Sequence, residues 1–321
     1  GPAATCGRCR EVKLFTSLEE LPTNPSGSAV TIGKFDGMHL GHRRMVELVN
    51  EVAAERGLVS TVLTFDRHPF ALLRPEACPL ALVSNEQKLG LLSEAGVDRT
   101  VMLEFTREFS QQAPDDFVLS VLVEAIATRV LVVGVDYRFG AGAKGTVTDL
   151  ERLGAVHGFD VVVVDPVAVD SAERVSSTRI RALLDEGEVR EAAVLLGRLA
   201  SVRGVVVHGA KRGHALGFPT ANLSPEHEGF IPADGVYAGW VLVGGERMPA
   251  AISVGNNPTF EGVPQKQVEA HVLDRELDLY DKTVEVQFAD RVRGMEKFDS
   301  LDELTAAIAR DVARVRVLLG L

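Results

Sequence analysis

The chain has 321 residues, 46% of them hydrophobic and 25% charged, and these values are ordinary for a globular protein with a packed core. Its 34 basic and 45 acidic residues leave a net charge of −11, which argues against a broad nucleic-acid or anionic-membrane surface but allows one small anionic ligand in a basic pocket. We expect no membrane span and no secretory signal. The three cysteines, Cys6, Cys9 and Cys78, favour the reducing cytoplasm, and Cys6 and Cys9 lack the second pair that a zinc site needs.

From residue 29 to about 165, short apolar runs alternate with helical segments. The runs are rich in Val, Ile and Leu and apolar on both faces, which is typical of parallel strands covered by helices. This alternation predicts a doubly wound α/β domain, with helices continuing over 177–187 and 189–197. Strands are expected at 29–32, 60–65, 100–103, 130–133 and 161–164, and helices at 41–56, 85–95, 114–127 and 147–157.

After residue 198 the pattern changes to strands separated by Gly, Pro and Asn clusters, at 201–207, 235–243, 250–254, 267–273 and 283–288. Such a pattern predicts an antiparallel barrel or sandwich. An amphipathic helix over 300–319 should close the chain. Its expected apolar stripe is Leu301, Leu304, Ile308, Val312 and Val315. We therefore expect a first segment 1–28, a domain 29–198 and a second domain 199–321.

The first expected strand runs into Gly33-Lys-Phe-Asp-Gly37-Met-His39-Leu-Gly41-His42 and then a helix. A helix N-terminus offers free N–H groups and a positive dipole end to anions. Two histidines three residues apart at that point can donate hydrogen bonds to phosphate oxygens. The alternative is a tight turn with two surface histidines, but the position directly after a strand favours the phosphate site.

A second helix start, Ser176-Ser177-Thr178-Arg179-Ile-Arg181, combines hydroxyls with guanidinium groups. Capping of the helix is the simpler interpretation of the hydroxyls. Arg181, with Arg179 as a second candidate, can clamp a phosphate. Both helix starts are expected at the carboxyl edge of one sheet, so the two segments should form one anion site.

Gly140-Ala-Gly142-Ala-Lys144-Gly145 fits GxGxxG, and Asp165 follows 20 residues after Gly145. A dinucleotide fingerprint turns immediately after its strand, whereas five residues separate Gly134 from Gly140, which argues against a dehydrogenase. The position of Lys144 before the last glycine also excludes a Walker A loop. We expect residues 136–140 to line the pocket and Lys144 to reach phosphates.

In the second half, a basic glycine-rich stretch covers residues 209–222. Such a loop can fold over phosphates with its N–H groups, or it is simply a barrel loop. The hydroxyl of Thr220 and the side-chain carbonyl of Asn222 are oxygen donors suited to Mg²⁺. Glu269 lies in a strand of alternating polarity, where it is either solvated or a general base facing a substrate hydroxyl.

These motifs together resemble the prokaryotic bifunctional riboflavin kinase/FMN adenylyltransferase (FAD synthetase) family. In family order they span nearly the whole chain after residue 28. The resemblance implies a Rossmann-like HxGH nucleotidyltransferase domain followed by an antiparallel flavokinase β-barrel with a C-terminal helix. The motifs are Thr31-Ile-Gly-Lys-Phe-Asp-Gly-Met-His-Leu-Gly-His42, Thr64-Phe-Asp-Arg-His-Pro69, Gly134-Val-Asp-Tyr-Arg-Phe-Gly140, Ser176-Ser-Thr-Arg-Ile-Arg181, Gly217-Phe-Pro-Thr-Ala-Asn222, Gly235-Val-Tyr-Ala-Gly239, Ala251-Ile-Ser-Val-Gly-Asn-Asn-Pro-Thr-Phe260, Val268-Glu-Ala-His271 and Met295-Glu-Lys-Phe298.

In the first domain the resemblance implies that His39, His42 and Arg181 are catalytic. Lys34 and Arg67 depart from the family pattern, and Arg67 either helps to hold the FMN phosphate or is solvated. The implied ATP contacts are His39, His42, Ser176, Ser177, Thr178 and Arg181 at the phosphates, and Gly33, Phe35, Asp36, Gly37 and Asp136 toward the adenine. The implied FMN contacts are Phe65, Asp66, His68 and Pro69.

In the second domain Glu269 is implied as the base that takes the proton from the ribityl 5′-hydroxyl of riboflavin. Thr220 and Asn222 are implied to hold Mg²⁺, and Arg293 and the C-terminal helix to border the flavin. The implied ATP contacts are Gly209, Lys211, Arg212, Gly213, Thr220 and Asn222.

The implied function is ATP-dependent synthesis of FMN from riboflavin and of FAD from FMN, with Mg²⁺. Adenylyl transfer of this kind is an in-line displacement that needs positioning and charge stabilisation but no protein nucleophile. Riboflavin, FMN and ATP are the expected partners, without nucleic acid or membrane; an oligomer is neither predicted nor excluded. Two alternatives stay open, namely a chain with one active module and a flavin- or nucleotide-sensing regulator.

Overall fold

The computed structural model describes residues 12–169, 173–208, 218–256, 266–275 and 277–321. The chain divides into two compact units: residues 1–81 with 85–175, and residues 82–84 with 176–321. The second unit therefore includes the two helices within residues 177–196 that precede the barrel. The domain boundary at residue 198 stays a prediction. Among the described helices, none is both long enough and apolar enough to cross a membrane.

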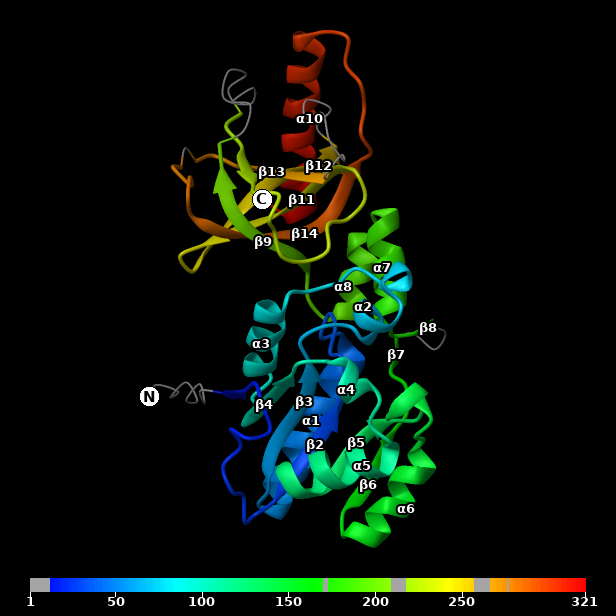
Figure 1. Ribbon diagram of the computed structural model, residues 1–321. Helices are drawn as coiled ribbons and strands as arrows, with labels where there is room; N and C mark the ends of the chain where they lie inside the picture. The colour runs from blue at the N-terminus through cyan, green and yellow to red at the C-terminus, as the bar shows by residue number, and fades with distance from the viewer. Residues whose placement is uncertain (1–11, 170–172, 209–217, 257–265, 276) are drawn as a thin grey trace, which may run out of the picture. The chain divides into compact units, whose positions relative to one another are not determined.

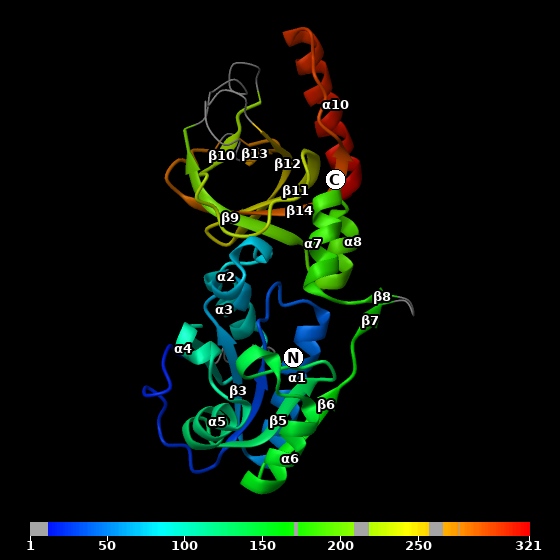
Figure 2. The ribbon, with the colours of Figure 1, turned by 45° about the vertical axis from the view of Figure 1, so that its right-hand side comes forward.

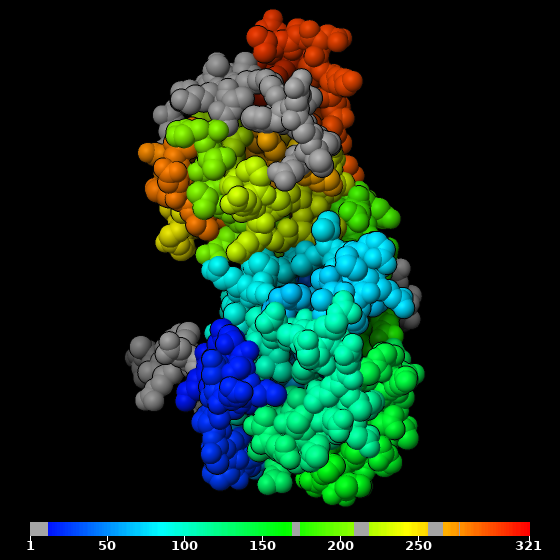
Figure 3. Space-filling model, in the orientation of Figure 1, coloured from blue at the N-terminus to red at the C-terminus, as the bar shows by residue number. Residues whose placement is uncertain are grey.

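The first unit is built on a six-stranded sheet in which every neighbouring pair is parallel. The predicted doubly wound α/β fold is confirmed. In sheet order the strands are β1 (Lys13–Phe15), β4 (Arg99–Leu103), β3 (Val59–Phe65), β2 (Ser28–Ile32), β5 (Thr128–Gly134) and β6 (Asp160–Val164). Strand β1 was not predicted, and residues 12–26 lie at the surface of this unit in Figure 3.

Helices cover both faces of this sheet because its strands are apolar on both sides (Figure 1). One face packs against α1 (Leu40–Arg56) and α3 (Asn85–Glu94). The other packs against α5 (Pro114–Phe117), η2 (Val118–Ala125) and α6 (Val147–His157). The predicted helix 114–127 is therefore an α-helical turn that continues as a π-helix. The shorter elements are α2 (Pro69–Leu73), η1 (Pro75–Ala77), α4 (Arg107–Ser110), η3 (Ala141–Ala143), β7 (Ala168–Val169) and β8 (Glu173–Arg174).

The second unit contains a closed barrel of six antiparallel strands. Of the two folds that the sequence pattern predicts, a barrel or a sandwich, the structure therefore has the barrel. In barrel order the strands are β10 (Ala221–Leu223), β13 (Lys266–Val272), β12 (Glu246–Asn256), β11 (Gly235–Val243), β14 (Thr283–Arg293) and β9 (Ala200–Val207). The helices α7 (Ser177–Glu186) and α8 (Val189–Leu196) precede it.

The C-terminal helix α10 (Leu301–Leu319) packs along the barrel wall, as Figure 2 shows. Ser300 caps it by accepting a hydrogen bond from the N–H of Glu303 at 3.2 Å. The predicted apolar stripe is wrong at its first position, because Leu301 is 68% exposed. Burial begins further along the helix, at Ala307, Asp311 and Val315, because the first turns of α10 do not contact the barrel core.

Candidate active sites

The loop between β2 and α1 holds an unusual backbone conformation. Phe35, Gly37 and Met38 have φ values of 50°, 82° and 42°, in the left-handed region that residues with a Cβ rarely adopt. The side chains of Phe35 and Met38 are nevertheless buried in the core beneath α1. That burial holds the loop in place, so that His39 arrives as the N-cap residue of α1.

The two predicted histidines lie face to face. Their rings stack with centroids 3.6 Å apart, and Nδ1 of His39 accepts a hydrogen bond from the N–H of His42 at 3.3 Å. Because Nδ1 of a neutral His39 accepts, its proton lies on Nε2, which is then a donor. Gly41 permits this arrangement, since a Cβ there would lie 3.2 Å from the His39 ring.

His42 is kept uncharged by its surroundings. Burial lowers the pKa of His42 well below its ordinary value, and electrostatic interactions with His39, Lys34 and Lys88 lower it further. Within the part of the chain that the structure describes, its buried Nδ1 has no hydrogen-bond partner. An orphaned buried polar atom at a helix N-terminus fits a site that binds an anion.

The structure brings the 65–69 segment next to this loop. Nε2 of His68 lies 3.0 Å from Nζ of Lys34, and Nδ1 of His68 accepts from the N–H of Phe70 at 3.1 Å, which caps α2. Phe65 ends β3, with its ring edge-on to Phe105 at 5.4 Å. Pro69 is the first residue of α2. Segments predicted for ATP and for FMN are thus neighbours.

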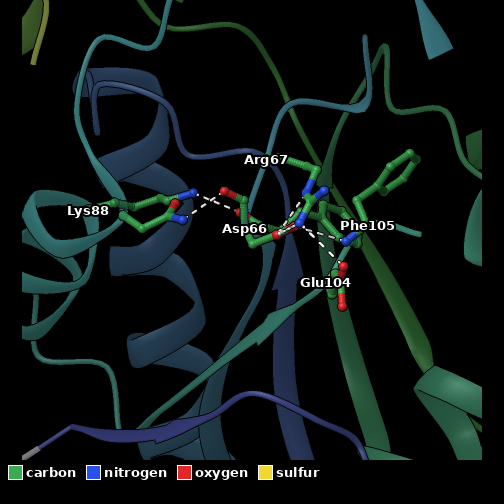
Figure 4. A network of polar contacts seen from close by, with 7 residues as sticks. Asp66, Arg67, Lys88, Glu104 and Phe105 are labelled. Atoms are coloured by element: carbon green, nitrogen blue, oxygen red, sulfur yellow. Dashed lines mark hydrogen bonds and ion pairs between the residues drawn. The ribbon is translucent and has the colours of Figure 1, made fainter. Parts of the chain in front are cut away.

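Asp66 is the centre of the polar network in Figure 4. Its Oδ2 accepts from Nη2 of Arg67 at 2.6 Å, and its Oδ1 accepts from the N–H of Phe105 at 2.9 Å. Burial acts to raise the pKa of Asp66, but these hydrogen bonds outweigh it and the pKa is lowered. Arg67 also contacts Glu104 at 3.3 Å and its side chain is 44% exposed, so its role at the FMN phosphate stays a prediction.

Asp136 follows β5 and is exposed, with an ion pair to Arg174.

The GxGxxG segment, residues 140–145, does not join a strand directly to a helix, which agrees with the five residues that separate Gly134 from Gly140. Phe139 and Gly145 form an isolated antiparallel bridge around a short 3₁₀ turn, and α6 begins only at Val147.

The predicted hydroxyl and arginine cluster begins α7. Ser176 is its N-cap, with Oγ accepting from the N–H of Arg179 at 3.2 Å. Ser177, Thr178 and Arg181 lie in the first turns of this helix. Because α7 belongs to the second unit and the histidines to the first, their union into one anion site stays a prediction.

On the barrel, regular strand pairing aligns the predicted kinase residues. Asn222 of β10 lies opposite Glu269 of β13, and Glu269 lies opposite Ser253 of β12. Val268 and Ala270, on either side of Glu269, are buried inside the barrel, so Glu269 faces outward and is half-buried. Nδ2 of Asn222 donates to the carbonyl of Thr220 at 3.4 Å. The three side chains Asn222, Glu269 and Ser253 therefore form a polar row across adjacent strands.

A cavity of about 350 Å³ has Thr220 in its wall, together with Ala221 and Ala270, the buried neighbours of Asn222 and Glu269. Its walls combine apolar barrel residues with Arg275 and residues 277–280, and they draw on parts of the chain as far apart in the sequence as Val206 and Tyr280. Tyr280 at its edge lies against the His208 ring, with centroids 3.9 Å apart. Representative lining residues are Val206, Thr220, Ala270, Val272, Leu279 and Tyr280.

Arg293 ends β14 and is engaged within the unit. Its Nε and Nη2 donate to the Asp311 carboxylate of α10 at 2.9 and 2.7 Å, and Nη1 donates to the Gly294 carbonyl at 3.0 Å. Its guanidinium also lies 5.5 Å from the centroid of the Phe298 ring. Hydrogen bonding to Asp311 raises the pKa of Arg293.

Four predicted ATP contacts, Gly209, Lys211, Arg212 and Gly213, lie outside the described residues, as do Cys6 and Cys9.

Comparison with known proteins assigns a family model to each half. The FAD synthetase model matches residues 21–179, and the riboflavin kinase model matches residues 196–319. The bifunctional riboflavin kinase/FMN adenylyltransferase of Escherichia coli (strain K12) is 36% identical over 312 residues, covering 97% of this chain and 99% of that protein. Its namesake in Pseudomonas fluorescens is 35% identical over 307 residues, covering 96% and 98%. A crystal structure described as a macrolide-efflux protein from Streptococcus pneumoniae has 34% identity and a TM-score of 0.85, covering 95% of this chain and 98% of that one.

Proposed function

Because the chain belongs to the family of bifunctional riboflavin kinase/FMN adenylyltransferases, we propose that the residues described above form its two active sites. The enzyme phosphorylates riboflavin with ATP to give FMN, and it transfers AMP from ATP to FMN to give FAD and pyrophosphate. The proposal is carried by two constellations found together in one chain. These are the stacked His39 and His42 at the start of α1 and the cross-strand pair Asn222 and Glu269.

In adenylyl transfer, an oxygen of the FMN phosphate attacks the α-phosphorus of ATP, and the bond to the pyrophosphate breaks. Nε2–H of His39, neutral His42 and the N-terminus of α1 stabilise the charge that develops on the phosphates. Arg181 with Ser176, Ser177 and Thr178 completes the phosphate site. Gly33, Phe35, Asp36, Gly37 and Asp136 form the adenine side, and Phe65, Asp66, His68 and Pro69 the FMN side.

In riboflavin phosphorylation, Glu269 takes the proton of the ribityl 5′-hydroxyl, whose oxygen attacks the γ-phosphorus of ATP while ADP leaves. The cavity that Thr220 lines has apolar barrel residues in its wall, among them Val206, Ala270 and Val272, and its volume is suited to an adenine ring. Arg293 borders the flavin through the position it gives to α10. The remaining ATP contacts are Gly209, Lys211, Arg212 and Gly213.

The donor set beside Glu269 fits Mg²⁺, because the Thr220 hydroxyl and the Asn222 side-chain carbonyl are hard oxygen ligands of the kind that this ion prefers. When bound, the ion neutralises phosphate charge. The same residues would hold the ATP phosphates in reach of Glu269. We infer a cytoplasmic location from the low content of three cysteines.

The direct test is incubation of the purified chain with riboflavin, ATP and Mg²⁺, with separation of the flavins by chromatography. FMN should form first and FAD should follow, and chelation of the divalent cation should stop both reactions. A single flavin product would contradict the two-site assignment, and so would calorimetry that finds one ATP bound per chain.

A further inference from the structure

Lys88 of α3 is a buried cation between the two loops that carry the proposed ATP and FMN contacts. Its side chain is 6% exposed. Nζ donates to the carbonyl of Phe65 at 2.9 Å and to the carbonyl of Lys34 at 3.4 Å. Figure 4 shows it reaching from its helix toward the segment that carries Asp66. Burying an ammonium group is unfavourable unless its donors are satisfied, and here two backbone carbonyls accept from two of its three N–H groups.

The Lys34 carbonyl lies directly before the first residue of the loop with a positive φ angle. It belongs to the peptide that precedes Phe35, the first of the left-handed residues that lead to His39. The hydroxyl of Thr64 donates to the same carbonyl at 3.3 Å. Strained backbone persists only where its surroundings over-determine it, and Lys88 and Thr64 provide that restraint from two sides.

We propose that Lys88 is a positioning residue for adenylyl transfer, which fixes the loop bearing His39 to the end of β3. The proposal rests on the proposed function, since it gives Lys88 a role in one of the two reactions. By tying Lys34 to Phe65, Lys88 sets the distance between the histidines and the FMN side of the site. Displacement of reacting groups by about 1 Å can cost about 100-fold in rate.

The charge of Lys88 has a second, separable effect. Burial lowers the pKa of Lys88 while the carboxylates of Asp36 and Asp66 act to raise it, and both carboxylates therefore favour the ammonium form. Lys88 in turn acts on His42, because its positive charge, like that of Lys34, lowers the pKa of His42. Loss of the Lys88 charge should therefore move the pKa of His42 upward.

The test compares Lys88→Met, which keeps the aliphatic stem, with Thr64→Val, which removes the neutral hydrogen bond to the same carbonyl. We expect Lys88→Met to lower kcat for FMN adenylylation by about 100-fold with little change in the KM for FMN. Riboflavin phosphorylation by the same preparation should stay at the wild-type rate. Thr64→Val should lose less activity, because the hydrogen bonds from Lys88 to the carbonyls of Lys34 and Phe65 remain.

The pH profile separates positioning from general destabilisation. In Lys88→Met the acid limb of kcat/KM for adenylylation should move to higher pH, whereas in Thr64→Val it should not move. An unshifted limb, wild-type adenylylation or an equal loss of both activities would overturn the proposal. If Lys88→Met does not fold by circular dichroism, Lys88→Leu, which also removes the donors and the charge, replaces it under the same criteria. If His39→Ala loses FMN adenylylation while Lys88→Met keeps full activity, only the positioning role of Lys88 is refuted. If His39→Ala keeps full activity, the proposed adenylyltransferase site itself is refuted.

Discussion

The two units hold their functional side chains in opposite ways. In the first, His39 is 7% exposed and follows a loop in which Phe35 and Met38 are left-handed, so its position depends on buried neighbours. In the second, Asn222 and Glu269 lie on ordinary antiparallel strands and are half-buried. Rigid N–H donors suit a reaction whose catalysis is mostly charge stabilisation. A regular row of oxygens suits a base and a metal that must meet a bound nucleotide.

Removal of the base should separate the two reactions most sharply. Glu269→Gln keeps the shape of the side chain but cannot take a proton, and we expect riboflavin phosphorylation to fall by about 10³-fold. FMN adenylylation, measured by FAD formation from FMN, should be unchanged. Glu285→Gln, also on a barrel strand, is the matched control. Equal loss of both activities in Glu269→Gln would break the division between the units.

The reciprocal change is His39→Ala. Loss of one preorganised donor typically costs about 10²–10³ in rate, so FAD formation should fall by that factor while riboflavin phosphorylation persists. His157→Ala removes a histidine of the same unit away from the loop and should have wild-type activity. Retention of full adenylyl transfer by His39→Ala would show that the stacked pair is not the phosphate site.

The attachment of α10 can be measured within the barrel alone. Asp311→Ala removes the partner of Arg293 from a pair whose side chains are 20% and 10% exposed. A charged hydrogen bond of this kind contributes about 2 kcal/mol to the free energy of unfolding. Urea unfolding followed by Trp240, the single tryptophan of the chain, should report this loss. An unchanged midpoint would mean that apolar packing alone holds α10.

The smallest expected effect concerns the pH dependence of the first unit. Its His42 has a folded-state pKa well below the ordinary 6.5, because of burial and then electrostatic interactions with His39, Lys34 and Lys88. Below pH 6.5 the unfolded chain binds a proton that the folded chain does not, so stability falls as the pH drops, by about 1 kcal/mol per pH unit. Hydrogen exchange in α1 should show this decline in the wild type and a weaker one in His42→Asn. Identical slopes would contradict a buried neutral His42.

The sequence was most informative where periodicity and motif coincide. Strands of the central sheet, the barrel and the HxGH loop could all be predicted, because long apolar runs and a strand–loop–helix motif leave few alternatives. Three-residue strands such as β1 and β10 are too short for a periodic signal. Lys88 has the pattern of a surface helix residue, and only the tertiary structure places carbonyls of two distant loops around it. The barrel cavity depends likewise on segments far apart in sequence.

Strand β1 protects the edge of the parallel sheet against pairing with a second copy of the chain. By pairing Lys13–Phe15 with Arg99–Val101, it covers N–H and C=O groups of β4 that would otherwise line an open sheet border. The new border is only three residues long and begins with the exposed Lys13, features that discourage strand addition by a neighbouring chain. Removal of residues 1–15, which takes away β1 and leaves β2 intact, should therefore promote self-association, measured by size-exclusion chromatography, even where both catalytic reactions survive.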